Sequence, residues 1–386
     1  MALIRGWRFL DSARINRIVR TLADELEAVG MRNLIGLQRT PIVNADDNEI
    51  VGKFKGQFVA ADVISDDQEA AVYDTVGQFE FVATEIPNLK LGSRVSQHMI
   101  NRLARLRQNI SGANDVKYFT DWENTLAESL VTGVRQRMNA LIMAMWMDAS
   151  SYDRYGIKLT NASWGTPANL KPVAGTSWND TANATPVSQI LTLAQETAPD
   201  NHGESYNRIT MSSKAFRNLI ATAEFKSKLA GLAGMEFKTP GIMATGGTSS
   251  TSGIQPVGDF AMYRQAFANM VGMEIELYDG HFYERNNNGK RAQVRYLPEN
   301  KVILSNSQDD NDSSAMDFAN GIVTESIVSP LIGHGGIGGE SFGPVAYFTG
   351  NENLNPPDIV AWAVARGFPR KHRETATAVI TTGSLS

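Results

Sequence analysis

The chain of 386 residues contains no cysteine and only five histidines. The absence of thiols excludes disulfide frameworks, iron–sulfur clusters, cysteine-ligated zinc and cysteine nucleophiles. No two histidines have the H-x-x-x-H or H-E-x-x-H spacing of a zinc site. The acidic run at residues 309–312 lacks the alternate ligand spacing of a calcium loop. We therefore expect no metal and no other cofactor.

Long apolar runs and a strong charge of either sign are also missing. No run approaches the roughly 18 apolar residues that span a bilayer, and the N-terminus lacks the apolar core of a secretory signal. The 36 basic and 41 acidic residues leave a net charge of −5, which argues against a protein whose whole surface binds nucleic acid. The length predicts two or three domains, or one elaborated domain.

A glycine-rich segment near the C-terminus matches two enzyme motifs. Gly333–Gly338 has the G-x-G-x-x-G spacing of dinucleotide sites, but its flanks supply neither the preceding strand nor the following helix. Ser341 lies in G-x-S-x-G, and Asp358 and His372 follow in the order of an esterase triad. A serine hydrolase using Ser341 is therefore the alternative function. The residues before Ser341 are nearly all glycine instead of a buried strand, so we predict that the chain is not an enzyme.

The first twenty residues are strongly basic and lead into a helical apolar pattern. Ile15, Ile18 and Leu22 recur at helical spacing after the possible cap Ser12. The segment is either an arm that packs on a partner while its basic side faces a polyanion, or an ordinary surface helix with a solvated basic face. The candidate contact residues are Arg5, Arg8, Arg14, Arg17 and Arg20.

A long two-stranded excursion follows the basic segment. Strands are predicted at Phe54–Ile64 and Gln78–Ala83, joined by the acidic Ser65–Glu69. A lone hairpin is marginally stable in water, so we expect it to lie on its own body or on a neighbouring subunit. The candidate contact residues are Phe54, Phe58, Asp66, Asp67, Phe79 and Phe81.

The strongest helical pattern lies between Thr120 and Ala149. Thr120 and Glu123 have the spacing of a capping box, and a helix to Ala149 would measure roughly 45 Å. A shorter helix is predicted at Ser93–Asn109. The apolar repeat of the long helix is Trp122, Leu126, Leu130, Val134, Met138, Leu141 and Met145.

Strands and helices alternate in the second half of the chain. Helices are predicted after Thr185-Pro186 and at Ser213–Ala223, the latter capped by Ser212. A basic strand edge near the C-terminus either protects against aggregation or forms an ion-paired subunit contact; it contains Arg366, Arg370, Lys371, His372 and Arg373. The predicted strands are Asn207–Met211, Glu274–Tyr278, His281–Arg285, Gln293–Tyr296, Val302–Ser305, Ile359–Arg366 and Ala376–Thr382. The fold class is α+β.

This order of elements resembles the major capsid protein of tailed bacteriophages, with the Hong Kong 97-like fold, and more closely the lambda-type capsid protein E family. The likeness covers most of the chain and consists of sequence patterns instead of an invariant signature motif. The residues that carry it are Ile50–Glu69, Leu89–Gly92, Val95–Leu106, Ser177–Asp180 with Thr185-Pro186, Arg208–Ser212, Phe216–Leu229, Ile275–Gly280, Tyr296–Pro298 and Val302–Leu304.

The resemblance implies a division of the chain. It makes residues 1–50 an N-arm, 51–92 an extended E-loop hairpin, and 93–165 a P-domain with the long spine helix. It makes 166–335 an A-domain and 336–386 the returning strands of the P-domain. The E-loop would lie across the adjacent subunit, and the A-domain tips would meet at the hexamer or pentamer axis.

The resemblance also implies a structural function. The chain would assemble with itself into hexamers and pentamers of an icosahedral shell around packaged double-stranded DNA, with no membrane. Scaffold, portal and possible decoration proteins would be further partners, and DNA contact would be non-specific. The protein would reside in the virion, and in the host cytoplasm during assembly. A cellular encapsulating shell of the same fold is a second alternative.

Overall fold

The computed structural model describes part of the chain as helices, strands and short connections. The described residues are 18, 42–45, 48–55, 78–85, 88–95, 113–148, 153–154, 157–158, 165–202, 204–233, 260–285, 291–306, 316–323, 341–342, 345–351 and 358–383. The statements below concern these residues.

The helical segments are α4 (Ala113–Trp146), the 3-10 turn η3 (Ala168–Leu170), α5 (Pro186–Leu191), the π-helix η4 (Thr192–Thr197), α6 (Ala198–His202), α7 (Ser213–Ala221), α8 (Ala223–Ala233) and α9 (Phe260–Val271). The strands are β1 (Ile42–Ala45), β2 (Asn48–Lys55), β3 (Gln78–Glu85), β4 (Asn88–Val95), β5 (Asp153–Arg154), β6 (Ile157–Lys158), β7 (Arg208–Met211), β8 (Glu274–Leu277), β9 (His281–Arg285), β10 (Arg291–Arg295), β11 (Lys301–Ser305), β12 (Met316–Val323), β13 (Ser341–Phe342), β14 (Val345–Asn351), β15 (Asp358–Lys371) and β16 (Thr377–Thr381).

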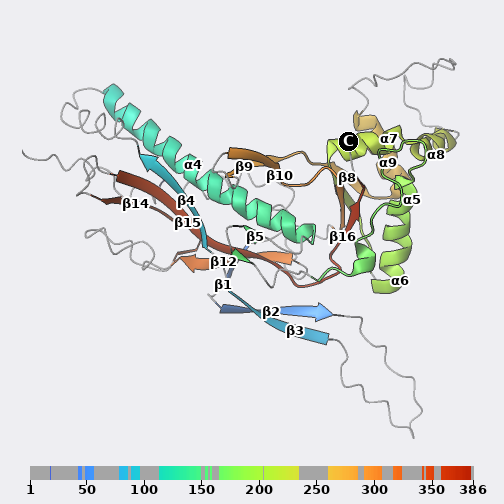
Figure 1. The fold of residues 1–386 in the computed structure, drawn as a ribbon, viewed down its shortest axis with the longest axis horizontal. Coiled ribbons are helices and arrows are strands. Elements are labelled where there is room, and N and C mark those ends of the chain that lie inside the picture. The colour runs from blue at the N-terminus through green and yellow to red at the C-terminus, as the bar shows by residue number, and fades with distance from the viewer. Residues whose placement is uncertain are drawn as a thin grey trace, which may run out of the picture.

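A six-stranded sheet is built around the long strand β15. The strand pairs antiparallel with β4, β12 and β14, while β1 runs parallel to β12 on its other side. Helix α4 runs along this sheet and contacts β15 and β4 (Figure 1). At 34 residues and 1.5 Å per residue, the helix is about 51 Å long.

A second, four-stranded sheet has the order β16-β11-β7-β8. Its β7–β8 pair is parallel and the other two pairs are antiparallel. Helices α5 to α9 gather around it at the opposite end of the molecule from β14 (Figure 1). This part has its own apolar core, which we name the second core, with Trp178, Phe216, Phe225 and Phe267 at its centre.

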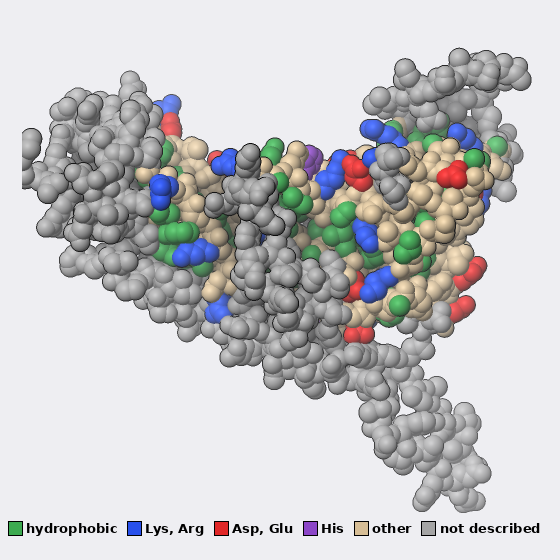
Figure 2. Space-filling view, in the orientation of Figure 1, with side chains coloured by type: hydrophobic (Ala, Val, Ile, Leu, Met, Phe, Trp, Pro, Cys, Tyr) green, Lys and Arg blue, Asp and Glu red, His purple; other side chains and the backbone are tan. Residues whose placement is uncertain are grey.

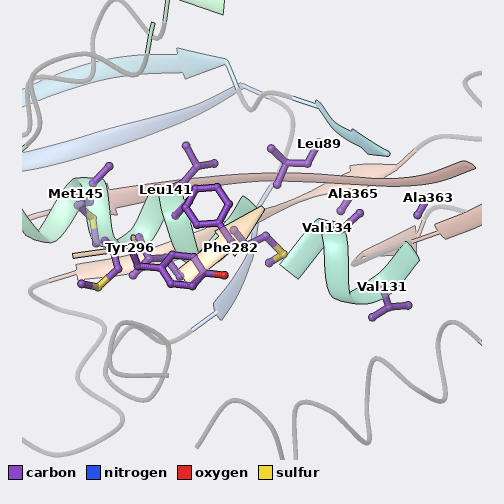
Figure 3. Packing of buried hydrophobic residues seen from close by; sticks show 14 of the residues in the cluster. Leu89, Val131, Val134, Leu141, Met145, Phe282, Tyr296, Ala363 and Ala365 are labelled. Atoms are coloured by element: carbon purple, nitrogen blue, oxygen red, sulfur yellow. The ribbon is translucent and has the colours of Figure 1, made fainter. Parts of the chain in front are cut away.

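The first core lies along α4. The predicted apolar repeat is confirmed, because Leu130, Val134, Leu141 and Met145 are all buried. Over the last turns the helix is buried on every side, since all residues from 141 to 146 are buried. The antiparallel hairpin β9–β10 contributes Phe282 to the same core, beside Tyr296 (Figure 3).

The long helix begins earlier than the sequence predicts. It starts at Ala113, so Thr120 and Glu123 lie within the helix and the predicted capping box is wrong. Glu123 is almost fully buried, at 2% exposed. The helix predicted at Ser93–Asn109 begins wrongly, because Ser93 and Val95 belong to β4, and residues 96–109 lie outside the described residues. Pairing of β4 with β15 decides the backbone there, since tertiary context overrides weak local propensity.

The strands are distributed over the two sheets in a way that crosses the predicted domain ranges. Strand β12, within 166–335, pairs in the six-stranded sheet, and β16, within 336–386, pairs with β11 in the four-stranded sheet. Strand β2 crosses the boundary at residue 50. Non-local pairing decides which sheet a strand joins, and a linear division of the chain cannot represent it. The boundaries themselves stay predictions.

Replacing Met138 by Asp tests the first core. Met138 is 4% exposed, and an unpaired buried charge is costly, so Met138→Asp should lower the free energy of unfolding by at least about 3 kcal/mol. Thr132→Asp, on an exposed position of the same helix, should change it by about 0.5 kcal/mol or less. Urea titration followed by circular dichroism measures both. Equal stability of the two variants would show that the helix register is wrong.

Candidate assembly surfaces

The hairpin β2–β3 is the most extended described element. Its strands pair antiparallel with each other and with no other described strand, and they lie apart from α4 along the lower edge of the molecule (Figure 1). Strand β2 begins at Asn48 instead of Phe54, and the strand predicted at Gln78–Ala83 is confirmed as β3.

The register of this hairpin brings three candidate residues together. Phe54 lies opposite Phe79, and Phe81 lies opposite Gly52. Because residues two apart along a strand share a face, the three phenylalanine positions belong to one face of the ribbon. The other three candidates, Phe58, Asp66 and Asp67, lie outside the described residues.

The basic N-terminal segment is represented by one described residue. Ile18 is helical, half-buried and packed against the first core. The five candidate arginines lie outside the described residues, namely Arg5, Arg8, Arg14, Arg17 and Arg20. The Ile18 contact agrees with the predicted apolar face of this helix.

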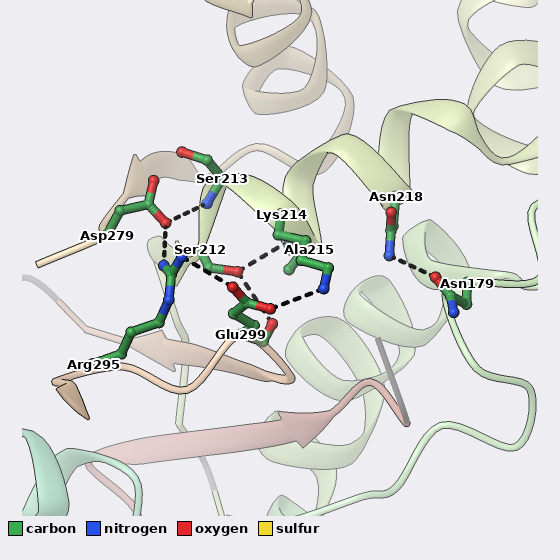
Figure 4. Close-up of polar contacts among 9 residues, drawn as sticks. All are labelled: Asn179, Ser212, Ser213, Lys214, Ala215, Asn218, Asp279, Arg295 and Glu299. Atoms are coloured by element: carbon green, nitrogen blue, oxygen red, sulfur yellow. Dashed lines mark hydrogen bonds and ion pairs between the residues drawn. The ribbon is translucent and has the colours of Figure 1, made fainter. Parts of the chain in front are cut away.

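A polar network, here named the Asp279 network, connects the hairpin of the first core with helix α7 of the second (Figure 4). Arg295, at the end of β10, binds Asp279 Oδ1 and Glu299 Oε1, each at 2.9 Å. Lys214, in the first turn of α7, binds Glu299 Oε2 at 3.0 Å. The Asp279 and Glu299 carboxylates therefore bind Arg295 from the β9–β10 hairpin, and Glu299 also binds Lys214 from α7.

The N-terminus of α7 supplies the remaining donors of this network. Ser212 is its N-cap, as predicted, and accepts a hydrogen bond from the Ala215 N–H at 3.0 Å. The Ser213 N–H donates to Asp279 Oδ1 at 3.2 Å. Partial burial would raise the pKa of Asp279, but the hydrogen bonds from Ser213 and Arg295 outweigh it and hold that pKa below its ordinary value.

A second polar network, the Asp148 network, ties the end of α4 to the segment that enters the second core. Asp148 has a left-handed backbone, with φ of 48°, which is typical of residues that follow a helix. Its Oδ1 accepts the Thr166 N–H at 3.2 Å, and its Oδ2 binds Lys171 Nζ at 2.5 Å. The buried carboxylate thereby has both a backbone donor and a cation.

Two of the five C-terminal basic residues lie in the interior, and the other three are partly exposed. The five residues begin on β15, the central strand of its sheet, and Arg370 and Lys371 are buried. Lys371 Nζ donates to Thr377 Oγ1 at 2.9 Å and to Thr166 Oγ1 at 2.5 Å. Because Arg370 and Lys371 are buried and β12 pairs with Arg366–Lys371, these two residues do not form the exposed protective edge that the sequence predicts.

Glu224 caps helix α5 from another part of the second core. Thr185 and Pro186 begin the helix as predicted, but Thr185 makes no side-chain cap hydrogen bond. The N–H groups of Val187 and Ser188 instead donate to the Glu224 carboxylate at 2.8 and 2.9 Å. Burial alone would raise the pKa of Glu224, but hydrogen bonds from Ser188, Lys228 and the two N–H groups outweigh burial and hold that pKa below its ordinary value.

The hydrolase alternative does not fit the described geometry. Ser341 lies in the short strand β13, which pairs antiparallel with β12, and the next described element is another strand. A nucleophile elbow requires a strand-to-helix turn. Asp358 begins the 14-residue strand β15, and His372 directly follows its last residue, so the two are about 45 Å apart at the rise of an extended chain. They cannot serve one triad.

Metal and membrane sites are absent from the part of the chain described here. No group of three or more His, Asp or Glu side chains could hold a metal ion among these residues. No described helix has the length and apolarity needed to cross a membrane. The described surface of the second-core half carries interspersed basic and acidic side chains on the face shown in Figure 2.

Solved structures share this architecture. A phage-related protein from Bordetella bronchiseptica RB50 matches with 12% identity, a TM-score of 0.50 and coverage of 98% of each chain. A putative capsid protein of a prophage of E. coli CFT073 matches with 11% identity, a TM-score of 0.50, and coverage of 96% of this chain and 99% of that one. The predicted fold class is confirmed: the chain has the Hong Kong 97-like capsid fold.

The sequence itself identifies the family. The family model of phage major capsid protein E matches residues 60–318, about two thirds of the chain. No curated protein matches the sequence. The chain belongs to the phage major capsid protein E family, and it is a structural, non-enzymatic protein of the icosahedral virion shell.

The Glu224 cap makes a prediction about stability and pH. Because the folded pKa of Glu224 is depressed from 4.5, its contribution is present above that pH and is lost as the pH falls through the folded value. Glu224→Gln should lower the free energy of unfolding at pH 7 by about 1–2 kcal/mol and flatten its decline below pH 4.5. Glu196→Gln, at an exposed position, is the control. Urea titrations between pH 3 and 7 measure both, and parallel profiles for the two variants would contradict the cap.

Proposed function

We propose that this capsid protein closes its shell through the β2–β3 hairpin, which lies on the adjacent subunit. The observation that carries the proposal is the hairpin, whose strands pair only with each other among the described strands. A two-stranded hairpin is marginal alone in water. Phe54, Phe79 and Phe81 share one ribbon face by register, which favours an apolar contact with a neighbour.

The same reasoning extends to the capsomers. Residues 51–92 act as the E-loop across the adjacent subunit, and the loops of the range 166–335 meet at the axes of hexamers and pentamers. Obligate interfaces often exceed about 2,000 Å² of buried surface. An extended hairpin that buries little surface against its own subunit can bury surface against a neighbouring subunit. The shell is held by interleaved segments, since a chain without cysteine forms no disulfides.

Further partners follow from the shell role. A scaffold and a portal protein take part in assembly in the host cytoplasm, and a decoration protein is an optional external partner. Packaged double-stranded DNA is held loosely, because the chain has a net charge of −5 and like charges repel. The arm arginines, from Arg5 to Arg20, are the proposed local contacts with its phosphates.

Removing residues 60–75 tests the hairpin proposal. The deletion takes away the far part of the excursion and leaves β2 and β3, so the purified subunit should remain folded but form few or no shells. A variant in which the same residues are replaced by an equal number of Gly and Ser keeps the chain length and should also assemble poorly. Negative-stain microscopy and light scattering measure assembly, and circular dichroism measures folding. Normal shells from both variants would refute a subunit contact made by residues 60–75.

A further inference from the structure

We propose that the outward face of the β9–β10 hairpin is a second contact for double-stranded DNA, separate from the N-terminal arm. The proposal rests on the proposed enclosure of DNA by the shell. The face, here named the hairpin face, is defined by His281, Tyr283, Arg291 and Gln293. It lies on the part of the first core that covers α4.

The two sides of this hairpin differ sharply in burial. Phe282 is buried, stacks on Tyr296 with ring centroids 4.7 Å apart, and lies beneath the Arg137 guanidinium. The next residue, Tyr283, is 66% exposed. Its cross-strand neighbour Gln293 is exposed as well. One side of the hairpin thus packs onto α4, while the other presents polar and aromatic side chains to solvent.

Arg291 places an exposed positive charge at the far end of the hairpin. Arg295, at the near end, is neutralised by Asp279 and Glu299. Arg291 is exposed and forms no ion pair with any residue that the structure describes, and Arg285 lies directly opposite it in the register. Like charges at directly opposite positions destabilise a strand pair, so this arrangement is favoured by an anion that binds both positions.

The chemistry of the face fits the phosphate backbone of a duplex. Arg, Gln and Tyr side chains are all typical donors to phosphate oxygens, which fix position without reading sequence. Glu284 is the only acid within the two strands, and it lies opposite Ala292, next to the arginine pair. Tyr283 is the one aromatic residue of this face, beside His281, Arg291 and Gln293.

Salt-dependent binding of a 30-base-pair duplex to unassembled subunits tests the proposal. The test variant is Arg285→Gln with Arg291→Gln, made in a chain whose five arm arginines are already glutamine so that the arm does not hide the effect. Loss of two phosphate contacts should reduce the slope of log affinity against log salt concentration by about 1.8. Fluorescence anisotropy of a labelled duplex measures the slope.

The matched control removes two exposed charges elsewhere. Lys117→Gln with Lys226→Gln makes the same change of net charge at exposed positions on α4 and α8, and it should leave the slope within experimental error. A hairpin variant that behaves like this control would overturn the proposal. Competition by polyglutamate as strong as that by duplex DNA of equal charge would also overturn it, and would assign the face to an acidic protein.

Two further measurements separate this inference from the shell proposal. Because the titration uses unassembled subunits, its outcome does not depend on shell formation, which microscopy measures on the same variants. In complete particles, hydroxyl-radical oxidation of Tyr283 should be slower when DNA is packaged than after it has been released. Equal oxidation in filled and emptied particles would overturn a contact with packaged DNA.

Discussion

The burial of helix α4 is the constraint on which the rest of the structure depends. The helix lies along β15 and β4, and toward its C-terminal end the β9–β10 hairpin covers it as well, so that residues 141–146 are wholly buried. A helix that is apolar on one face near its start and on all faces near its end needs two different covers. The sheet supplies the first and the hairpin the second, and the strands that belong to each must come from distant parts of the chain.

Polar networks keep the two cores in a defined relation once α4 is covered. The Asp279 network joins β10 to α7, and the Asp148 network joins the end of α4 to Thr166 and Lys171. Buried charges are tolerated only when they are paired and hydrogen-bonded, so the buried Asp148 carboxylate favours the arrangement that gives it the Thr166 N–H and Lys171. A fixed arrangement of the two cores matters in a capsid subunit. Each interface repeats throughout a closed shell, so small errors in subunit shape accumulate.

Much of this could be predicted from local patterns. The apolar repeat of α4, the Ser212 cap and the paired strands β9 and β10 are all encoded by neighbouring residues, and each is found in the structure. The fold class and the family followed from the order of these elements. The candidate contact residues of the arm and the hairpin stay predictions, because a contact with another subunit leaves no signal in the periodicity of one chain.

The amino-acid sequence by itself determined that the protein carries no thiol chemistry, that it has one unusually long amphipathic helix, and that its elements occur in the order of a capsid subunit. Only the tertiary structure decided where that helix begins, that Lys371 is buried, and that Glu224 caps α5. The physical reason is the range of the interactions. Helical periodicity and caps act over a few residues, whereas strand partners and buried ion pairs join residues far apart in the chain.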